Sequence, residues 1–342
     1  MKYAFVFPGQ GSQKQNMASD FYSCSKLLDT SKNIYPNIEN IFKLPDPELS
    51  QTENSQPAIF VACSMIWEEI NKMYSFSSLS NNAGNNNEHS IQNGHINQAD
   101  KLQTSDQTTV NKNDTKMIPA PSFFAGHSLG EYSACFASNA INFESGLELI
   151  KLRSRLMSKS KGTMFACIGK FDDVQNLCQF VSEKTNKICQ IANDNNDTQV
   201  VISCENDCID LINKSYKNFN VKRCIQLKVS GGFHSPLVES VKSELSKGIN
   251  EVMFNDVEIP VISNKTALPE KIGQKIKDNL MDHVVSGVKW RETIMFMKEN
   301  GVEKIVEVGG NVLSKISAKL GVDSFSISNK NELLDLESFL NK

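Results

Sequence analysis

Short apolar runs that end at glycine alternate with helical patterns along most of this chain. Residues 3–8 (YAFVFP) and 121–126 (PSFFAG) have the length and the continuous apolar character of buried parallel strands. Residues 56–74 have the pattern of a helix, and Pro57 is expected in its first turn. These elements predict a first strand, a helix and a second strand.

The same alternation returns near the end of the chain. Two more strands are expected within residues 257–264 (VEIPVISN) and 301–310 (GVEKIVEVGG), and a helical region over residues 278–300 separates them. Strands that alternate with helices in this way predict an α/β fold with a mostly parallel sheet.

Residues 164–230 follow a different order. Their apolar runs and helical patterns predict strand, helix, strand, strand, helix, strand, which is the ferredoxin-like order βαββαβ. We therefore expect a small ferredoxin-like domain over residues 163–230, inserted into a large domain made of residues 1–162 and 231–342. A cleft between two such bodies is the default place for a ligand.

Residues 77–116 differ from the rest of the chain in composition. They contain nine Asn and four Gln but no aromatic residue, Met or Cys. Such a segment cannot bury enough apolar surface to offset the entropy of ordering it, so a disordered insertion is predicted. His89 and His95 lie in it and are set aside as site candidates.

Composition narrows the function classes. The 342 residues carry a formal net charge of −3 with a pI near 6.0, which favours neither nucleic acid nor a membrane surface as partner. The first ten residues enter a strand pattern directly, so no signal or transit peptide is visible. The nine cysteines form no CxxC pair, and Cys204 and Cys208 lack a second pair nearby. We expect free thiols in a reducing compartment and no metal site.

The strongest chemical signal is Gly126-His127-Ser128-Leu129-Gly130, which lies between a predicted strand and a predicted helix. This context is typical of a nucleophile elbow, in which a sharp turn exposes the serine hydroxyl. The alternative is a glycine-rich turn with a surface serine. His127 is poorly placed as a base, because the residue before the serine of an elbow points away from the hydroxyl.

Two other histidines lie outside the predicted insertion. His234 follows a Gly-Gly turn at the end of a strand, where the loops of active sites gather. His283 lies in a helical stretch and is more typical of packing. His234 is therefore the better candidate for the base.

Arg153 is predicted to project near the middle of the apolar stripe of a helix, three residues after Ile150 and three before Leu156. An inward guanidinium costs several kcal/mol unless a carboxylate or a phosphate meets it, on the order of the penalty for any buried ion. A core Asp or Glu, or exposure at the helix edge, would satisfy it structurally. A substrate carboxylate is the alternative that implies function.

The first strand leads into residues 7–13 (FPGQGSQ), in which two glycines flank Gln10. Such a loop lets backbone amides approach a ligand at the carboxyl end of a parallel sheet. An amide there, together with the amide of Leu129, would form an oxyanion hole. A glycine-rich turn without this role is the alternative.

Taken together, these residues resemble the malonyl-CoA:acyl carrier protein transacylase family, the acyltransferases of fatty-acid synthesis. The motifs run in family order from Phe5 to Ile316, and cover nearly the whole chain apart from residues 77–116. They are FVFPGQGSQ, QPAIF, AGHSLGEYSA, LIKLRSRLM, QVVIS, VSGGFHSPLV, PVISNKTA and VEVGGNVLSKI.

The resemblance implies an α/β-hydrolase-like large domain that carries the ferredoxin-like small domain. It also implies that Ser128 is the nucleophile and His234 the general base, and that Arg153 holds the malonyl carboxylate. The amides of Gln10 and Leu129 would form the oxyanion hole.

Further positions take implied roles from the same resemblance. The main-chain carbonyl of His283 would orient the catalytic histidine, and Asn195 would lie near the substrate. Lys222 and Arg223 fall where the family's basic pair docks the carrier protein, although a solvated charge pair is the alternative. The local sequences Ser286-Gly287-Val288-Lys289-Trp290 and Gly309-Gly310-Asn311 depart from the family pattern.

The activity implied is ping-pong transfer of malonyl from malonyl-CoA to the phosphopantetheine thiol of acyl carrier protein, which supplies type II fatty-acid synthesis without a cofactor. Phe233-His234-Ser235 favours malonyl among related acyltransferases. A serine esterase or thioesterase, or a silent module that binds the carrier protein, is the competing function. We expect a monomer, located in a plastid-type (apicoplast-like) organelle after loss of a leader, or in the cytoplasm.

Overall fold

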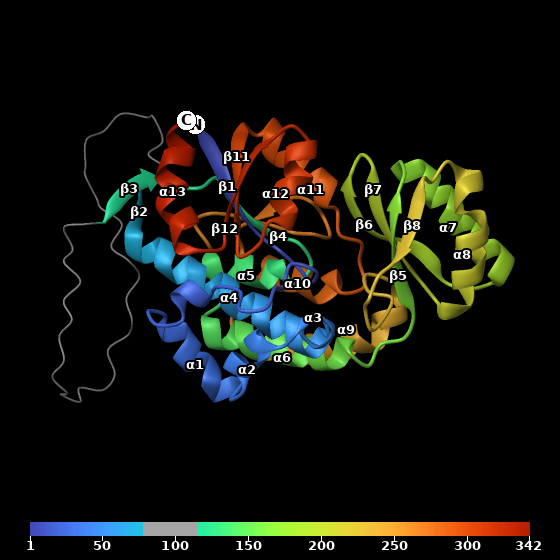
Figure 1. Ribbon diagram of the computed structural model, residues 1–342, viewed down its shortest axis with the longest axis horizontal. Coiled ribbons are helices and arrows are strands. Elements are labelled where there is room, and N and C mark those ends of the chain that lie inside the picture. The colour runs from blue at the N-terminus through green and yellow to red at the C-terminus, as the bar shows by residue number, and fades with distance from the viewer. Residues whose placement is uncertain (78–114) are drawn as a thin grey trace.

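The computed structural model describes residues 1–77 and 115–342 (Figure 1). The predicted disordered insertion, with His89 and His95, lies outside the described residues except at its ends. There, Ser77 ends strand β2 (Tyr74–Ser77) and Lys116 begins strand β3 (Lys116–Pro119), and the two strands pair in parallel. The boundaries given to the insertion at residues 77 and 116 were therefore wrong, because both end residues belong to paired strands.

Six strands form the large sheet, in the order β10-β9-β4-β1-β11-β12. All neighbours pair in parallel except β10 and β9, so the prediction of a mostly parallel sheet is confirmed. The strands are β1 (Lys2–Phe7), β4 (Phe123–Gly126), β9 (Val261–Ile262), β10 (Pro269–Glu270), β11 (Val302–Val308) and β12 (Asp323–Ile327).

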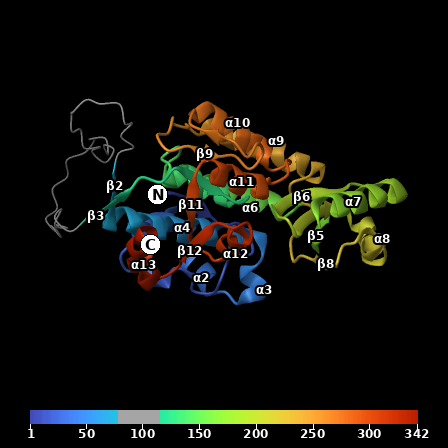
Figure 2. The ribbon, with the colours of Figure 1, turned by 90° about the horizontal axis from the view of Figure 1, so that it is seen from above.

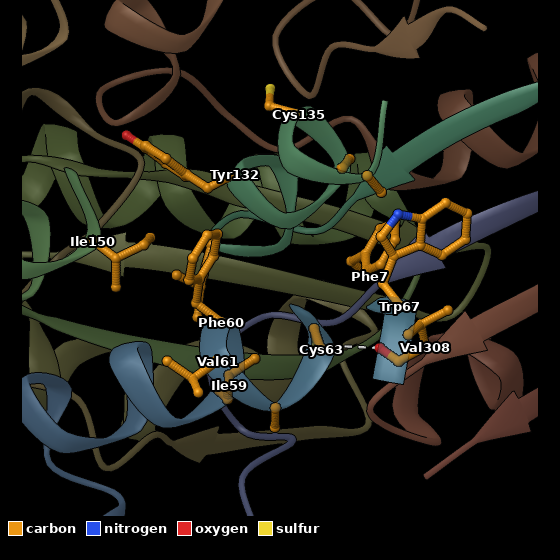
Figure 3. Packing of buried hydrophobic residues seen from close by; sticks show 14 of the residues in the cluster. Phe7, Ile59, Phe60, Val61, Cys63, Trp67, Tyr132, Cys135, Ile150 and Val308 are labelled. Carbon is orange, nitrogen blue, oxygen red and sulfur yellow. Dashed lines mark hydrogen bonds between the residues drawn. The ribbon is translucent and has the colours of Figure 1, made fainter. Parts of the chain in front are cut away.

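Alternate residues of the central strand β1 face two different hydrophobic clusters. Phe5 and Phe7 pack with the helices of one face, and Ala4 and Val6 pack with those of the other. Both faces of a parallel sheet are covered in this way, which explains the continuous apolar runs. Figure 3 shows the first cluster, in which Phe60 projects from a helix toward neighbouring side chains.

Helices lie on both faces of this sheet (Figures 1 and 2). They are α1 (Lys26–Ile34), α2 (Ile38–Lys43), α3 (Asp46–Leu49), α4 (Thr52–Met73), α5 (Gly130–Ala137), α6 (Phe143–Met157), α9 (Glu239–Glu251), α10 (Gly273–His283), α11 (Trp290–Glu299), α12 (Val312–Lys319) and α13 (Lys330–Asn341). In the part of the chain that the structure describes, no helix has the length and apolar character needed to cross a membrane.

Helix α4 begins earlier than predicted. Its first residue is Thr52, so Pro57 lies inside the helix and not in its first turn. The polar start of the helix was the cause of the error, because polar residues before an apolar run are typical of a loop. Here Thr52, Ser55 and Gln56 are all buried.

The helical region predicted over residues 278–300 is two helices, not one. Helix α10 ends at His283 and α11 begins at Trp290. Since the chain leaves the helix after His283, the carbonyl groups of Ser286 and Val288 can take partners from elsewhere in the protein, namely His234 Nδ1 and the Asp194 amide. This break lies beside the candidate site described below.

The predicted order βαββαβ is confirmed for the second sheet. Its antiparallel strands, in the order β6-β7-β5-β8, lie at one end of the molecule (Figures 1 and 2). Along the chain the unit consists of β5 (Thr163–Ile168), α7 (Phe171–Thr185), β6 (Cys189–Asn196), β7 (Gln199–Cys204), α8 (Ile209–Ser215) and β8 (Arg223–Gln226).

The small sheet is joined to the large one by polar contacts at the end of β6. Asp194 forms a salt bridge with Arg291 of α11, with Asp194 Oδ2 2.7 Å from Nη2 and 2.9 Å from Nε. The Asp194 amide donates to Val288 O and the Val288 amide donates to Ala192 O. These contacts fix the small sheet beside the break between α10 and α11.

Candidate active site

Ser128 lies in a sharp turn between strand β4 and helix α5. Its φ is 53°, in the left-handed region that is uncommon for residues with a side chain. The glycines on either side make the turn feasible: a Cβ on Gly126 would lie 1.9 Å from Gly130 C, and one on Gly130 would lie 2.0 Å from Phe7 O. The predicted strand–turn–helix context of the GxSxG motif is confirmed, and the alternative of an ordinary surface turn is not.

Asn264 supports this turn from the end of strand β9. Its Oδ1 accepts a hydrogen bond from the Ser128 amide at 2.7 Å, and its Nδ2 donates to Gly126 O at 2.5 Å. The buried carboxyl of Glu131 accepts a hydrogen bond from the main-chain amide of Asn264 at 3.2 Å. Burial raises the pKa of Glu131 to about 8. Sequence reasoning assigned no role to either residue.

His234 is the partner of the Ser128 hydroxyl. Its Nε2 lies 2.8 Å from Ser128 Oγ, and its Nδ1 lies 3.2 Å from His283 O and 3.1 Å from Ser286 O. Carbonyl oxygens only accept hydrogen bonds, so Nδ1 carries the proton and Nε2 is free to accept from Ser128. The tautomer is the one that a general base for Ser128 requires.

The imidazole of His234 is buried and uncharged. Burial, followed by the positive charge of Arg153, lowers its pKa to about 3. Above that pH the ring holds no positive charge, so at neutral pH its Nε2 is available for a proton.

Arg153 reaches the same hydroxyl from helix α6. Its Nη2 donates to Ser128 Oγ at 3.1 Å, and its guanidinium carbon lies 5.7 Å from the centre of the Tyr132 ring. The side chain is 1% exposed. Within residues 1–77 and 115–342, no carboxylate lies within salt-bridge distance of Arg153, and burial lowers the pKa of its guanidinium. The structural ion pair considered from the sequence is therefore absent from the described residues.

Ser128, His234 and Arg153 line one cavity of about 260 Å³. Its apolar walls come from the end of helix α6, strand β5 and the segment that follows β8. They are Met157, Met164, Leu227, Val229 and Phe233. The remaining lining is mostly polar and includes Gln10 and Asn193. A small molecule with one anionic end fits these walls, because a single buried cation lies at the reactive hydroxyl.

Gln10 supplies a main-chain amide at this cavity, and Leu129 supplies one directly after Ser128. Gln10 lines it, and Leu129 follows Ser128 at the start of α5. Among the hydrogen bonds of residues 1–77 and 115–342, neither amide has an acceptor. The Gln10 side chain points away, donating to Thr52 Oγ1 at 3.3 Å. Both amides are therefore free to donate to a bound oxygen.

The region around Asn195 differs from expectation. Asn195 is buried behind His127, with its Oδ1 2.9 Å from His127 Nε2, and it does not line the cavity. Asn193 lines the cavity instead. The reason is the irregular pairing of β6 with β7, which shifts register between Ile191 and Asn193 and again between Asp194 and Asn196.

The ring of His283, as well as its carbonyl, lies beside His234. Its buried ring stacks on that of His234 with centres 5.1 Å apart, and its Nδ1 lies 3.4 Å from Glu131 Oε2. Ser286, to which sequence reasoning gave no role in holding His234, supplies the second carbonyl. Helix α10 ends at His283, so neither carbonyl is used by a further helical turn, although His283 O also accepts from the Ser286 amide at 3.2 Å.

Lys222 and Arg223 are exposed at the start of β8, the edge strand of the small sheet. They do not line the cavity. Lys228, also exposed and on the same segment, lines both the cavity and an adjoining groove of about 630 Å³. The segment thus carries three cations from the sheet edge to the mouth of the cavity.

Residues 114–319 match the family model described as acyl transferase domain, which includes every site residue above except Gln10. The malonyl CoA-acyl carrier protein transacylase of Synechocystis sp. is 31% identical, over 99% of this chain and 100% of its own. The protein of the same name from Staphylococcus aureus strain MRSA252 is 29% identical, over 94% of this chain and 93% of its own.

Solved structures of similar fold cover nearly the full length of the chain. An acyl carrier protein S-malonyltransferase from Vibrio cholerae superposes with a TM-score of 0.80 at 26% identity, covering 98% of this chain and 100% of its own. The malonyl-CoA:ACP transacylase of Synechocystis superposes with a TM-score of 0.78 at 27% identity, covering 98% of this chain and 100% of its own.

Proposed function

This chain belongs to the acyl transferase family, among the malonyl CoA-acyl carrier protein transacylases, and we propose that it moves the malonyl group from malonyl-CoA to the phosphopantetheine thiol of acyl carrier protein. The transfer passes through a malonyl ester of Ser128. Its product is an extender unit for type II fatty-acid synthesis.

The observation that carries this proposal is the buried guanidinium of Arg153 at the reactive hydroxyl. Within the described chain it has no carboxylate partner, and it is 1% exposed. A buried charge of this kind is costly unless an opposite charge meets it. The free carboxylate of a malonyl group would complete a bidentate ion pair, because the planar guanidinium presents parallel N–H groups to such a ligand.

In the acylation step, Ser128 Oγ attacks the thioester carbonyl while His234 Nε2 takes its proton. The resulting oxyanion accepts hydrogen bonds from the amides of Gln10 and Leu129. The bond from carbon to sulfur then breaks, and the histidine returns its proton to the CoA thiolate. A carrier-protein thiol reverses these steps, giving up its proton to His234 as its sulfur attacks the malonyl-serine ester.

No acidic third residue is required in this mechanism. The carbonyls of His283 and Ser286 hold the imidazole in the reactive tautomer, which is the positioning role of the aspartate in a hydrolase triad. Only side chains and amides of the protein take part, so we propose that the transfer proceeds without a cofactor.

The groove that adjoins the cavity suits the rest of the thioester. It shares Ser50, Lys228 and Val229 with the cavity and adds Lys159. We propose that the pantetheine arm leaves the cavity here, and that the phosphates of CoA lie near Lys159 and Lys228.

Two other functions compete. A serine esterase or thioesterase would use the same elbow with water as acceptor and would have no use for Arg153. A silent carrier-binding module would not need the bond between Ser128 and His234. Intact-mass measurement after mixing with malonyl-CoA separates the three, since the proposal requires a malonyl adduct that holo carrier protein removes. An adduct lost equally fast without carrier protein would support the hydrolase, and no adduct would support the module.

His234→Ala is expected to slow acylation by about 10²–10⁴-fold, which is typical for the loss of a general base. His283→Ala should slow it far less, because the proposed role of residue 283 depends on its main-chain carbonyl. Stopped-flow measurement of CoA release gives both rates. If His283→Ala proved the more damaging, the roles of the two histidines would have to be exchanged.

Carrier-protein docking is expected to depend on Lys222 and Arg223. Reversal of both charges to Glu should raise the KM for carrier protein and leave that for malonyl-CoA unchanged, since the pair lies outside the cavity. Added salt should reduce the difference, because exposed charges are screened over about 10 Å at 0.1 M. Steady-state kinetics against each substrate measure both effects.

Reversal of Lys214 and Lys217 is the matched control, with the same charge change on the helix-covered side of the same unit. Equal effects of the two double variants would mean that net charge, and not a docking site, is responsible. No effect of either would leave Lys222 and Arg223 as a solvated pair.

We also propose the domain assignment expected from the sequence. Residues 1–162 and 231–342 form an α/β-hydrolase-like domain, and residues 163–230 form a ferredoxin-like one. The monomeric state, and location in a plastid-type organelle or the cytoplasm, stay predictions.

A further inference from the structure

Two cysteines face each other across strands β5 and β8 of the small sheet. Cys167 and Cys224 are register partners, and their Sγ atoms lie 3.0 Å apart. Both side chains point to the face of the sheet that α7 and α8 cover, where Cys167 is buried and Cys224 is half-buried. The proposed transfer uses neither thiol.

The pairing pattern places them at a position suited to a cross-strand bond. The Leu227 amide donates to Met164 O, so residues 164 and 227 form a hydrogen-bonded pair. Such pairs alternate along an antiparallel ladder, which makes Cys167 and Cys224 a non-hydrogen-bonded pair. The Cα atoms of such pairs are about 4.5 Å apart, within the range that a disulfide spans.

The two thiols differ in reactivity. The contact between the two thiols lowers the pKa of Cys224, while the same contact and burial raise the pKa of Cys167. Cys224 is also half-buried, whereas Cys167 is buried, and it lies on an edge strand, which small reagents can approach from its free side. Cys224 is therefore suited to attack an oxidant, and Cys167 to react second.

We propose that Cys167 and Cys224 form an oxidisable dithiol, which a peroxide converts to an intramolecular disulfide between β5 and β8. The Cys224 thiolate attacks the peroxide oxygen, forming a sulfenic acid and releasing hydroxide. The Cys167 sulfur then attacks the sulfenic sulfur and expels water. The dithiol loses two electrons and two protons, the peroxide becomes two waters, and an added dithiol reductant reverses the change.

A second cysteine pair in the same sheet serves as an internal control. Cys189 and Cys204 are register partners between β6, the other edge strand, and β7, an inner strand, but both side chains are buried. Hydrogen bonds with neighbouring thiols and burial raise the pKa of each. Both pairs are cross-strand register partners with one member on an edge strand, so a difference in oxidation would report the burial of the thiols and their thiolate character.

The experiment is peptide mapping of the whole protein after brief treatment with hydrogen peroxide, with free thiols blocked by N-ethylmaleimide in denaturant. We expect one linked peptide pair containing Cys167 and Cys224, and its loss on treatment with dithiothreitol. Cys189 and Cys204 should be recovered as blocked thiols. Recovery of Cys167 and Cys224 as blocked thiols, or a Cys189–Cys204 link of equal yield, would overturn the proposal.

Variants test the order of attack. With Cys167→Ser, the sulfenic acid on Cys224 should persist and be trapped by dimedone, whereas Cys224→Ser should leave Cys167 unmodified. Cys24→Ser removes a half-buried thiol elsewhere in the protein and should leave the linked peptide unchanged. Dimedone on Cys167 instead of Cys224 would reverse the assignment. These readouts are masses, so they do not depend on the proposed acyl transfer.

Discussion

Replacement of Ser128 by alanine is expected to abolish the covalent malonyl adduct and to lower the rate of malonyl transfer by on the order of 10⁴-fold or more. The reason is geometric. The Ser128 hydroxyl is held between the imidazole of His234 at 2.8 Å and the guanidinium of Arg153 at 3.1 Å. Within residues 1–77 and 115–342, the main-chain amides of Gln10 and Leu129 have no acceptor. Intact-mass measurement after incubation with malonyl-CoA detects the adduct.

Ser133→Ala is the matched control for this experiment. Ser133 lies on the helix that follows the turn, is buried, and has no hydrogen-bond partner for its hydroxyl within residues 1–77 and 115–342. Its removal should leave both adduct and rate near wild type. An adduct of unchanged mass on the Ser128→Ala protein would refute the assignment of the nucleophile.

The turn that holds Ser128 could be predicted from the sequence because its cause is local. A strand, two small residues and a helix follow each other within a few positions, and Gly126 and Gly130 are required by their direct contacts with the backbone. The inward position of Arg153 was predictable for a similar reason, since helical spacing alone decides which face a residue occupies.

The supports of the site could not be predicted in this way. Asn264 and Glu131 are 133 positions apart in the sequence and meet only when β9 pairs with β4. The carbonyls that hold His234 depend on the end of α10, which no breaking residue marks before Gly287. The spacing of apolar residues predicts which of them are buried, but it does not predict the burial of polar residues such as these. Their hydrogen-bond partners can be identified only from the tertiary structure.

Misjudged details have physical causes of the same kind. Pro57 was placed in a first turn because the five polar or small residues before it resemble a loop, yet the packing of α4 against the rest of the domain buries several of them. Asn195 was placed beside the substrate, but the register shifts of β6 turn Asn193 toward the cavity. One extra residue in a strand moves the side chains that follow it to the opposite face of the sheet, and the amino-acid composition does not reveal such an irregularity.

Arg153→Ala is expected to lower the ratio of kcat/KM for malonyl-CoA to that for acetyl-CoA by roughly 10²–10⁴-fold, as for breaking a buried ion pair at about 3–5 kcal/mol. Malonyl and acetyl differ by one carboxylate, so discrimination needs a cation that only malonyl satisfies. When the wild-type protein binds acetyl-CoA, the buried guanidinium of Arg153 stays unpaired. When the Arg153→Ala variant binds malonyl-CoA, the malonyl carboxylate stays unpaired. Acetyl transfer should persist or rise, because the contact of Ser128 with His234 remains. Steady-state kinetics with both thioesters measure the ratio.

Three further variants decide whether Arg153 acts through its charge and shape. Arg153→Met keeps an unbranched side chain without charge and should behave as Arg153→Ala, which excludes a packing defect as the cause. Arg153→Lys should rescue malonyl transfer poorly, because a point charge on a flexible stem cannot reproduce the bidentate fork. Arg155→Ala removes an exposed arginine from the same helix and should leave the ratio unchanged. If the ratio stayed at its wild-type value in Arg153→Ala, the guanidinium would not be the group that recognises malonyl, and the proposed substrate would lose its physical basis.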